Sequence, residues 1–144
     1  MVTAWRRQLL DVGWADRCSF MVFDARRMPF RSESISVVTS VGGMQNIKGD
    51  RPAYQEAARV LRPNGRLLDN MVLYEEGGQS QRELSAIQAT STWHEYESLL
   101  CELGLSIERW ELVSSRRGKS NPEDGYPKNN ETWEMRMVFA IKNV

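Results

Sequence analysis

Apolar and polar positions change their period several times along the chain, and these changes mark out helices and strands. Apolar residues spaced three and four apart indicate amphipathic helices, whereas short apolar runs bounded by turn residues indicate strands. The predicted elements are a helix over 3–12, strands over 20–23 and 35–41, a helix from about 52 to 61, a strand over 66–74, helical segments from 80 and from 92 to 103, and strands over 107–115 and 133–141.

The segment from 35 to 74 predicts a βαβ unit. Its first strand is rich in β-branched residues and ends at Gly42-Gly43, where backbone can approach a ligand closely or form a loose turn. Pro52 suits a first helical position, and the turn signal Pro63-Asn64-Gly65 ends the helix and starts the next strand. Two strands joined through a helix are expected to be parallel neighbours in one sheet.

The C-terminal part predicts a capped helix followed by a two-stranded hairpin. Thr92 and Glu95 fit a capping box, and Gly104 provides a left-handed stop after a stripe of leucines. Residues 116–132 have the composition of a hairpin connection. The last strand is apolar on both faces in its second half, which favours an interior position in the sheet.

Composition narrows the class of protein. The chain has 144 residues, enough for one domain with a real core, so we treat residues 1–144 as a single α/β domain. Its 19 basic residues balance 19 acidic ones, which gives no global field for nucleic acid or an anionic membrane. Two cysteines, Cys18 and Cys101, lack metal or disulfide spacing. No window is apolar enough to span a membrane, so we expect a cytoplasmic protein.

Three motifs stand in a fixed order: FDARRMPF at 23–30, SVGGMQNI at 40–47 and EAARVLRPNGRLL at 56–68. Together they resemble the second half of class I S-adenosylmethionine-dependent methyltransferases, and most closely the small-molecule group of type 11. The resemblance covers about residues 3 to 113, and the last strand fits the family's terminal β-hairpin. It implies a Rossmann-like sheet that binds its cofactor at the carboxyl ends of the strands.

The resemblance also implies site residues. Asp24 would accept a hydrogen bond from the adenine amino group, the Ala25 backbone would meet the ring edge, and Met28 would flank the ring. The floor beneath the methionine moiety would be formed by Ser40, Val41 and Gly42. Acceptor-facing positions fall on Gln45 and Asn46. The cofactor would be S-adenosylmethionine, the partner a small-molecule acceptor, and no metal or catalytic side chain is implied, because methyl transfer from a sulfonium needs positioning above all.

The sequence departs from the family at its N-terminal side. The glycine-rich turn and the acidic residue that would hold the ribose are absent before FDARRMPF. The fold is therefore expected to be partial, lacking two βα units, on the order of 60 residues at about 30 each. The strand at 20–23 would lose its neighbour and the strand at 35–41 would have an open edge. Either these strands pair directly, another chain fills the gap, or the chain is a fragment.

Several motif residues also have a purely structural interpretation. Glu56, Arg59 and Arg62 would form a solvated helix face with i, i+3 pairing. Trp93 and Tyr96 suit packing better than a substrate pocket, and Cys101 would be buried. Two functions therefore compete: methyl transfer to a small organic acceptor, and a non-catalytic module that associates with itself or with a complementing chain through the open sheet edge.

Overall fold

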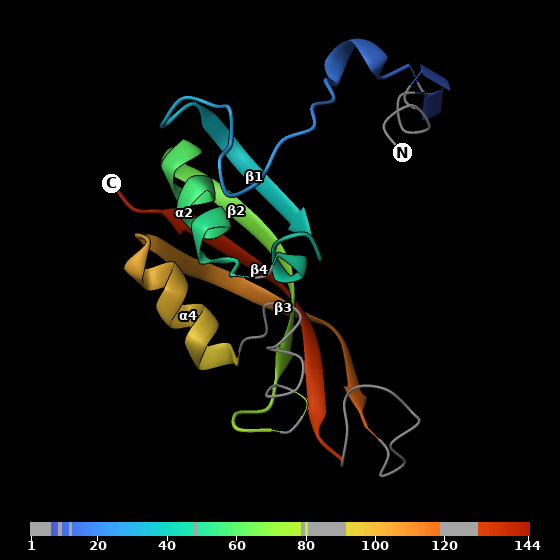
Figure 1. Ribbon diagram of the computed structural model, residues 1–144, viewed down its shortest axis with the longest axis vertical. Helices are drawn as coiled ribbons and strands as arrows, with labels where there is room; N and C mark the ends of the chain where they lie inside the picture. Colours follow the sequence, from blue (N-terminus) through green and yellow to red (C-terminus); the bar gives the residue numbers. More distant parts are fainter. Residues whose placement is uncertain are drawn as a thin grey trace.

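The computed structural model describes residues 7–8, 10–11, 13–47, 49–78, 80, 92–118 and 130–144. Its elements in chain order are η1 (Ala15–Arg17), β1 (Ile35–Val41), η2 (Met44–Asn46), α2 (Arg51–Val60), β2 (Leu61–Tyr74), α4 (Trp93–Glu102), β3 (Leu105–Arg117) and β4 (Thr132–Lys142). The four strands form one mixed sheet with the order β1-β2-β4-β3 (Figure 1). Among the described helices, none is long and apolar enough to cross a membrane.

The sheet combines a parallel and an antiparallel half. β1 and β2 run parallel, while β4 runs antiparallel to both β2 and β3. This confirms the predicted βαβ unit, the C-terminal hairpin and the interior position of the last strand. The Rossmann-like α/β fold class is confirmed with it.

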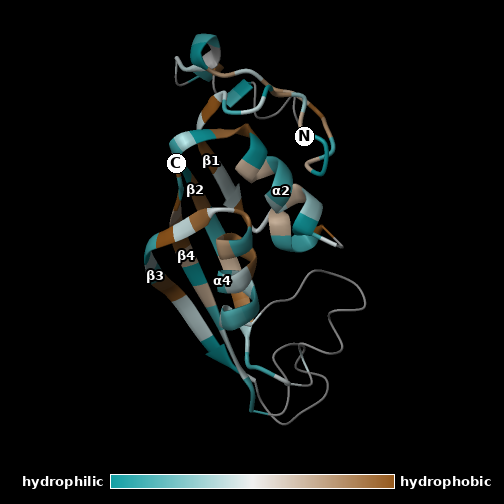
Figure 2. Cartoon of the chain, turned by 90° about the vertical axis from the view of Figure 1, so that its left-hand side faces the viewer, coloured by the Kyte–Doolittle hydropathy of each residue, from teal (hydrophilic) through white to brown (hydrophobic). Residues whose placement is uncertain are grey.

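Both helices pack on one face of the sheet (Figure 2). Every second residue of β2 and β4 points into this layer, and the core there includes Leu67, Met71, Leu73, Val138 and Ala140. The predicted small-residue face of α2 is buried, with Ala53, Ala57 and Ala58 against the sheet. Small side chains let the helix lie close to the strands.

The connection between α2 and β2 differs from the predicted turn. β2 begins at Leu61, directly after the helix, and Pro63-Asn64-Gly65 forms an irregularity inside the strand, where the pairing moves from Ile35↔Leu61 to Val37↔Arg66. Asn64 has a φ of 61°. A side chain at Gly65 would come within 2.8 Å of the Arg62 carbonyl oxygen, so a glycine is required there. Pro63-Asn64-Gly65 therefore lies within β2, as an irregularity in its pairing, and does not separate α2 from β2.

The helix signals at 92–104 are confirmed. The Thr92 hydroxyl accepts a hydrogen bond from the Glu95 N–H, and the Glu95 carboxylate accepts one from the Thr92 N–H. Tyr96 and Leu100 are fully buried, and Gly104 has a φ of 72°. Cys101, however, is exposed, because it lies on the side of α4 that faces away from the sheet.

The predicted strand at 20–23 is wrong. These four residues have no regular structure, and their side chains are exposed, with Val22 at 87%. A strand is stable only when a neighbour accepts its backbone hydrogen bonds, and the segment has no such neighbour in the described sheet. The hairpin connection also starts later than predicted, since Arg116 and Arg117 belong to β3.

Two further predictions fall mainly outside the described residues. Of the helix at 3–12, the described positions 7, 8, 10 and 11 are helical, and Gly13 follows with a φ of 71°. Of the helical segment from 80, residues 81–91 lie outside the described part, as do residues 119–129 of the hairpin connection.

Candidate functional site

A groove of about 780 Å³ runs along the outer side of β1 and around its carboxyl end. One wall is the motif segment 23–30, through Phe23, Ala25, Met28 and Phe30. The floor is β1 with the start of η2, including Ser40, Val41, Gly43 and Met44. The groove therefore brings together four of the six predicted cofactor-binding residues: Ala25, Met28, Ser40 and Val41.

The wall of the groove is held by an Arg–Glu clasp on α2. The Arg59 guanidinium donates to the Met28 and Phe30 carbonyl oxygens at 3.1 and 3.0 Å. Glu56 completes the clasp: its carboxylate accepts from the Met28 N–H at 2.7 Å and from Arg59 at 2.7 and 2.8 Å. Arg59 lowers the pKa of the Glu56 carboxyl. The predicted i, i+3 pairing of Glu56 and Arg59 is confirmed. The two side chains do not simply form a solvated helix face, because they also fix the motif segment 23–30.

Asp24 lies outside the groove lining. Its carboxylate forms a bidentate pair with Arg26, at 3.0 Å to Nε and 2.9 Å to Nη2, and also accepts from the Arg26 N–H. These hydrogen bonds lower the pKa of Asp24, and both side chains are about half exposed. A ligand amine would therefore compete with Arg26 for this carboxylate.

Removing Arg26 should free the Asp24 carboxylate. In Arg26→Gln we expect the pKa of Asp24 to rise toward its ordinary value of about 3.9, because the charged donor that favours the ionised form is lost. A carbon-detected NMR titration of the Asp24 carboxyl measures this. Arg27→Gln is the matched control, and an equal shift in both variants would contradict the pairing.

The carboxyl end of β1 is shaped by short polar contacts. The Ser40 hydroxyl accepts from the Met44 N–H at 3.1 Å, which starts η2 directly after the strand. Gly42 has a φ of 64° and is not part of the groove lining. Gly43 is, and a side chain there would come within 3.3 Å of the Ser40 oxygen. Gly43 thus keeps this end of the groove open.

Gln45 and Asn46 are engaged within the protein. The Gln45 side-chain oxygen accepts from the Val72 N–H at 2.9 Å, and the Asn46 amide donates to the Gly42 carbonyl oxygen. These bonds fasten η2 across the ends of β1 and β2. The two predicted acceptor-facing residues therefore lie between the groove and the carboxyl end of β2.

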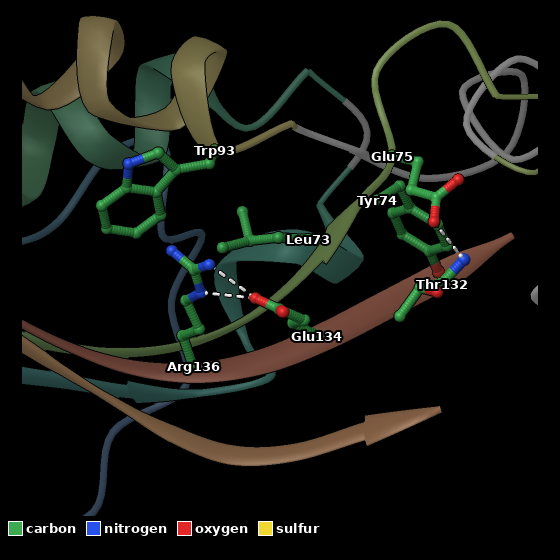
Figure 3. A pocket seen from close by; sticks show the side chains of 7 residues that line it. All are labelled: Leu73, Tyr74, Glu75, Trp93, Thr132, Glu134 and Arg136. Carbon is green, nitrogen blue, oxygen red and sulfur yellow. Dashed lines mark hydrogen bonds and ion pairs between the residues drawn. The ribbon is translucent and has the colours of Figure 1, made fainter. Parts of the chain in front are cut away.

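A second, smaller cavity of about 230 Å³ opens at the carboxyl end of β2 (Figure 3). Arg136 in its wall pairs with Glu134, and its guanidinium lies 4.5 Å from the Trp93 ring centre and 4.0 Å from that of Trp110. Glu75 accepts from the Thr132 N–H at 2.8 Å. The remaining lining residues are Leu73 and Tyr74. Trp93 was predicted to pack against other residues, and it also lines this cavity.

A buried polar cluster lies behind the groove floor. Asp69 on β2 is fully buried and pairs in register with Ser40. One of its oxygens, Oδ2, accepts from the hydroxyls of Tyr54 at 2.5 Å and Tyr96 at 3.0 Å. The other, Oδ1, has no hydrogen-bond partner in the described structure. Burial raises the pKa of the Asp69 carboxyl, although the hydrogen bonds from the Tyr54 and Tyr96 hydroxyls act in the opposite direction.

Comparison with known proteins gives both a family match and fold matches. Residues 1–69 match the family model described as a methyltransferase domain. Over 68 residues the chain is 40% identical to the ubiquinone/menaquinone biosynthesis C-methyltransferase UbiE of Hahella chejuensis, a match that covers 47% of this chain and 27% of that protein. The chain thus spans about a quarter of the curated relatives that it matches.

Solved structures match over nearly the whole chain. The [4+2]-cyclase SpnF superposes with a TM-score of 0.71 at 17% identity, covering 96% of this chain and 60% of that one. The geranyl diphosphate C-methyltransferase of Streptomyces coelicolor, solved with S-adenosyl-L-homocysteine, superposes with a TM-score of 0.67 at 12% identity, covering 95% and 57%. At these identities the structural matches show the shared fold. Among the described residues no cluster of His, Cys, Asp and Glu could hold a metal ion.

Proposed function

We propose that this chain forms the adenine and acceptor side of an S-adenosylmethionine-dependent methyl-transfer site, because residues 1–69 match the model of the methyltransferase-domain family and the sheet shares the fold of solved methyltransferases. The groove along β1 is the observation that carries the proposal, since it unites Ala25, Met28, Ser40 and Val41 from two separate motifs. The reaction class is methyl transfer to a small organic acceptor.

The chemistry of the groove residues supports the proposed cofactor. Ala25, Met28 and Phe30 give a largely apolar wall for a flat ring, while the Gly43 backbone leaves room where a side chain would meet Ser40. Asp24 would receive the adenine amine after releasing Arg26, and Gly42 would adjoin the methionine moiety. Bound cofactor supplies a methyl group already activated on a sulfonium, so the chain's own contribution is to orient it and the acceptor.

The acceptor would lie toward the carboxyl end of β2. Gln45 and Asn46 hold η2 over this edge, since Gln45 accepts from the Val72 N–H. The second cavity is lined by Leu73 and Tyr74 at the end of the same strand and by Trp93 (Figure 3). About 230 Å³ corresponds to roughly eight water volumes of about 30 Å³ each. That size supports a small acceptor.

Titration with S-adenosylmethionine in the millimolar range, followed by amide NMR shifts, tests the proposal. We expect shifts at Ala25, Met28 and Val41, with adenosine alone reproducing those at Ala25 and Met28. Gly43→Ala should weaken cofactor binding, because its added carbon meets Ser40 at the floor. If no shift occurs at these amides, or if the shifts fall on other parts of the sheet, the proposed cofactor site is wrong.

The second candidate function is association through the open edge of the sheet. One observation favours it: β1 is an outer strand and has no charged residue between Ile35 and Val41. Sheet edges left without charge are prone to pair with another strand.

A further inference from the structure

Among the described residues, Asp69 is the only acidic side chain that is fully buried, and the proposed site gives it no role. The Tyr54 hydroxyl of α2 and the Tyr96 hydroxyl of α4 both donate to one of its oxygens, Oδ2. The other oxygen, Oδ1, has no hydrogen-bond partner in the described structure. A buried polar atom without a partner is costly, so this oxygen marks a contact with a purpose.

The neighbour of Asp69 across the sheet is Ser40, which lies at the floor of the groove. The two residues are register partners in the parallel pair of β1 and β2. Such partners direct their side chains to the same face of the sheet, and the strands lie about 4.8 Å apart. The Ser40 hydroxyl accepts from the Met44 N–H and donates to no described residue. The unused donor of Ser40 therefore lies beside the unused oxygen of Asp69.

We propose that Asp69 is a positioning residue for the cofactor groove: it holds the Ser40 hydroxyl, and through it the Met44 N–H. A hydroxyl has one hydrogen to donate and two lone pairs. Ser40 can therefore donate to Oδ1 of an ionised carboxyl or accept from a protonated one. In both cases a lone pair of Ser40 remains for the Met44 N–H, so either form of Asp69 can hold the hydroxyl.

The contact matters because it anchors the turn that forms the end of the groove. Ser40, Gly43 and Met44 all line the groove, and the Ser40 hydroxyl is the partner that the described structure gives the Met44 N–H. Between them lie Gly42 and Gly43, which leave the backbone free to take many conformations. Asp69, held from both helices, would fix this turn. The inference rests on the proposed function for what the groove binds, but the contact itself requires no cofactor.

Hydrogen exchange at the Met44 amide, without cofactor, tests the contact. The rate is read while the Ala57 amide of α2 stays protected, so that local opening alone contributes. Asp69→Leu should raise the rate at least about tenfold, whereas Asp69→Asn, which can still bond to Ser40, should keep it within about twofold. Tyr54→Phe is the matched control, because it removes a hydrogen bond from the other oxygen of the same carboxyl. Equal rates in Asp69→Leu and Tyr54→Phe, or no rescue by Asp69→Asn, would overturn the proposal.

Asp69→Asn also gives a measurement that does not require the leucine variant to fold. Its side-chain oxygen must accept from the two tyrosine hydroxyls, so its nitrogen would donate to the Ser40 oxygen. We expect this side-chain amide to exchange slowly, and Ser40→Ala in the same background to speed its exchange at least about tenfold. Thr39→Ala, at the adjacent position of β1, is the control and should leave the exchange unchanged. A rate that is independent of the Ser40 hydroxyl would show that Asp69 does not hold it.

Titration with S-adenosylmethionine separates the positioning role from the proposed function. Asp69→Leu should bind the cofactor at least about threefold more weakly than the wild type, because the groove floor is no longer held in place before binding. Asp69→Asn should bind like the wild type. If the wild type shows no cofactor-induced shifts, the proposed function is wrong, and exchange at Met44 still decides whether Asp69 holds Ser40. If the wild type binds and Asp69→Leu binds equally well, the positioning role is wrong.

Discussion

At pH 7, Asp69→Asn should raise the melting temperature by about 3 °C, the shift that about 1 kcal/mol gives in a domain of this size. Asp69 is fully buried, and burial disfavours its ionised form, so its pKa is raised in the folded state. In the Asn variant, the side-chain oxygen can still accept hydrogen bonds from Tyr54 and Tyr96. The side-chain nitrogen takes the place of Oδ1, which has no hydrogen-bond partner in the described structure, and can donate toward the Ser40 hydroxyl.

The pH dependence gives the sign of this effect. A carboxyl whose pKa is raised on folding stabilises the native state less and less as pH rises from the unfolded value of about 3.9 to the folded value. The advantage of the Asn variant should therefore be present at pH 7 and vanish below about pH 4. Thermal unfolding at both pH values measures it. If the Asn variant melts lower at pH 7 than the wild type, the ionised carboxylate is stabilising and the assignment is wrong.

Tyr54→Phe provides the companion measurement. It removes one of the two hydroxyl donors to Asp69 and should cost about 2 kcal/mol at pH 7, because a buried carboxylate is left with less compensation. The same substitution in the Asp69→Asn background is the matched control and should cost less. Equal costs in both backgrounds would show that the hydroxyl does not act on the charge.

Arg59→Met should release the groove wall while leaving α2 intact. The variant keeps an unbranched side chain but loses the hydrogen bonds to Met28 and Phe30. We expect hydrogen exchange at the Met28 amide to rise at least about tenfold, because this amide is held by Glu56 within the same clasp. The NMR shifts caused by S-adenosylmethionine should be lost in parallel.

Arg62→Met is the control for this measurement, since Arg62 is exposed just beyond the helix. Equal exchange in the two variants would contradict the clasp. The clasp should also be insensitive to pH above about 4: Arg59 lowers the pKa of Glu56, so its contribution is lost only as pH falls through that lowered value.

The elements predicted correctly are those whose signals are local. The β-branched run at 35–41 and the Thr92–Glu95 capping box each act through neighbours a few residues away, and both are found where predicted. The segment 20–23 has an equally strong apolar signal. It fails because a strand needs a neighbour that only the tertiary structure can provide.

The candidate site was likewise predictable only where its signals are local in the sequence. Motif order brought Ala25, Met28, Ser40 and Val41 to one groove, but the link between them, through Arg59 and Glu56, depends on a contact about 30 residues apart in the chain. Asp69 was missed as well. A carboxylate within the apolar run LLDNMVL was a usable signal, but the two tyrosines that hold it come from different helices and have no fixed spacing.

The interior position of β4 has a consequence for the order of folding. The last strand in the chain lies between β2 and β3, which do not pair with each other. During synthesis the βαβ half can form as soon as β2 has emerged, but β3 has no place in the sheet until β4 arrives. Pairing of β2 with β4 closes a loop of nearly 60 residues between Tyr74 and Trp133. Such non-local closure is slow, so the rate of folding should be governed by the insertion of this final strand.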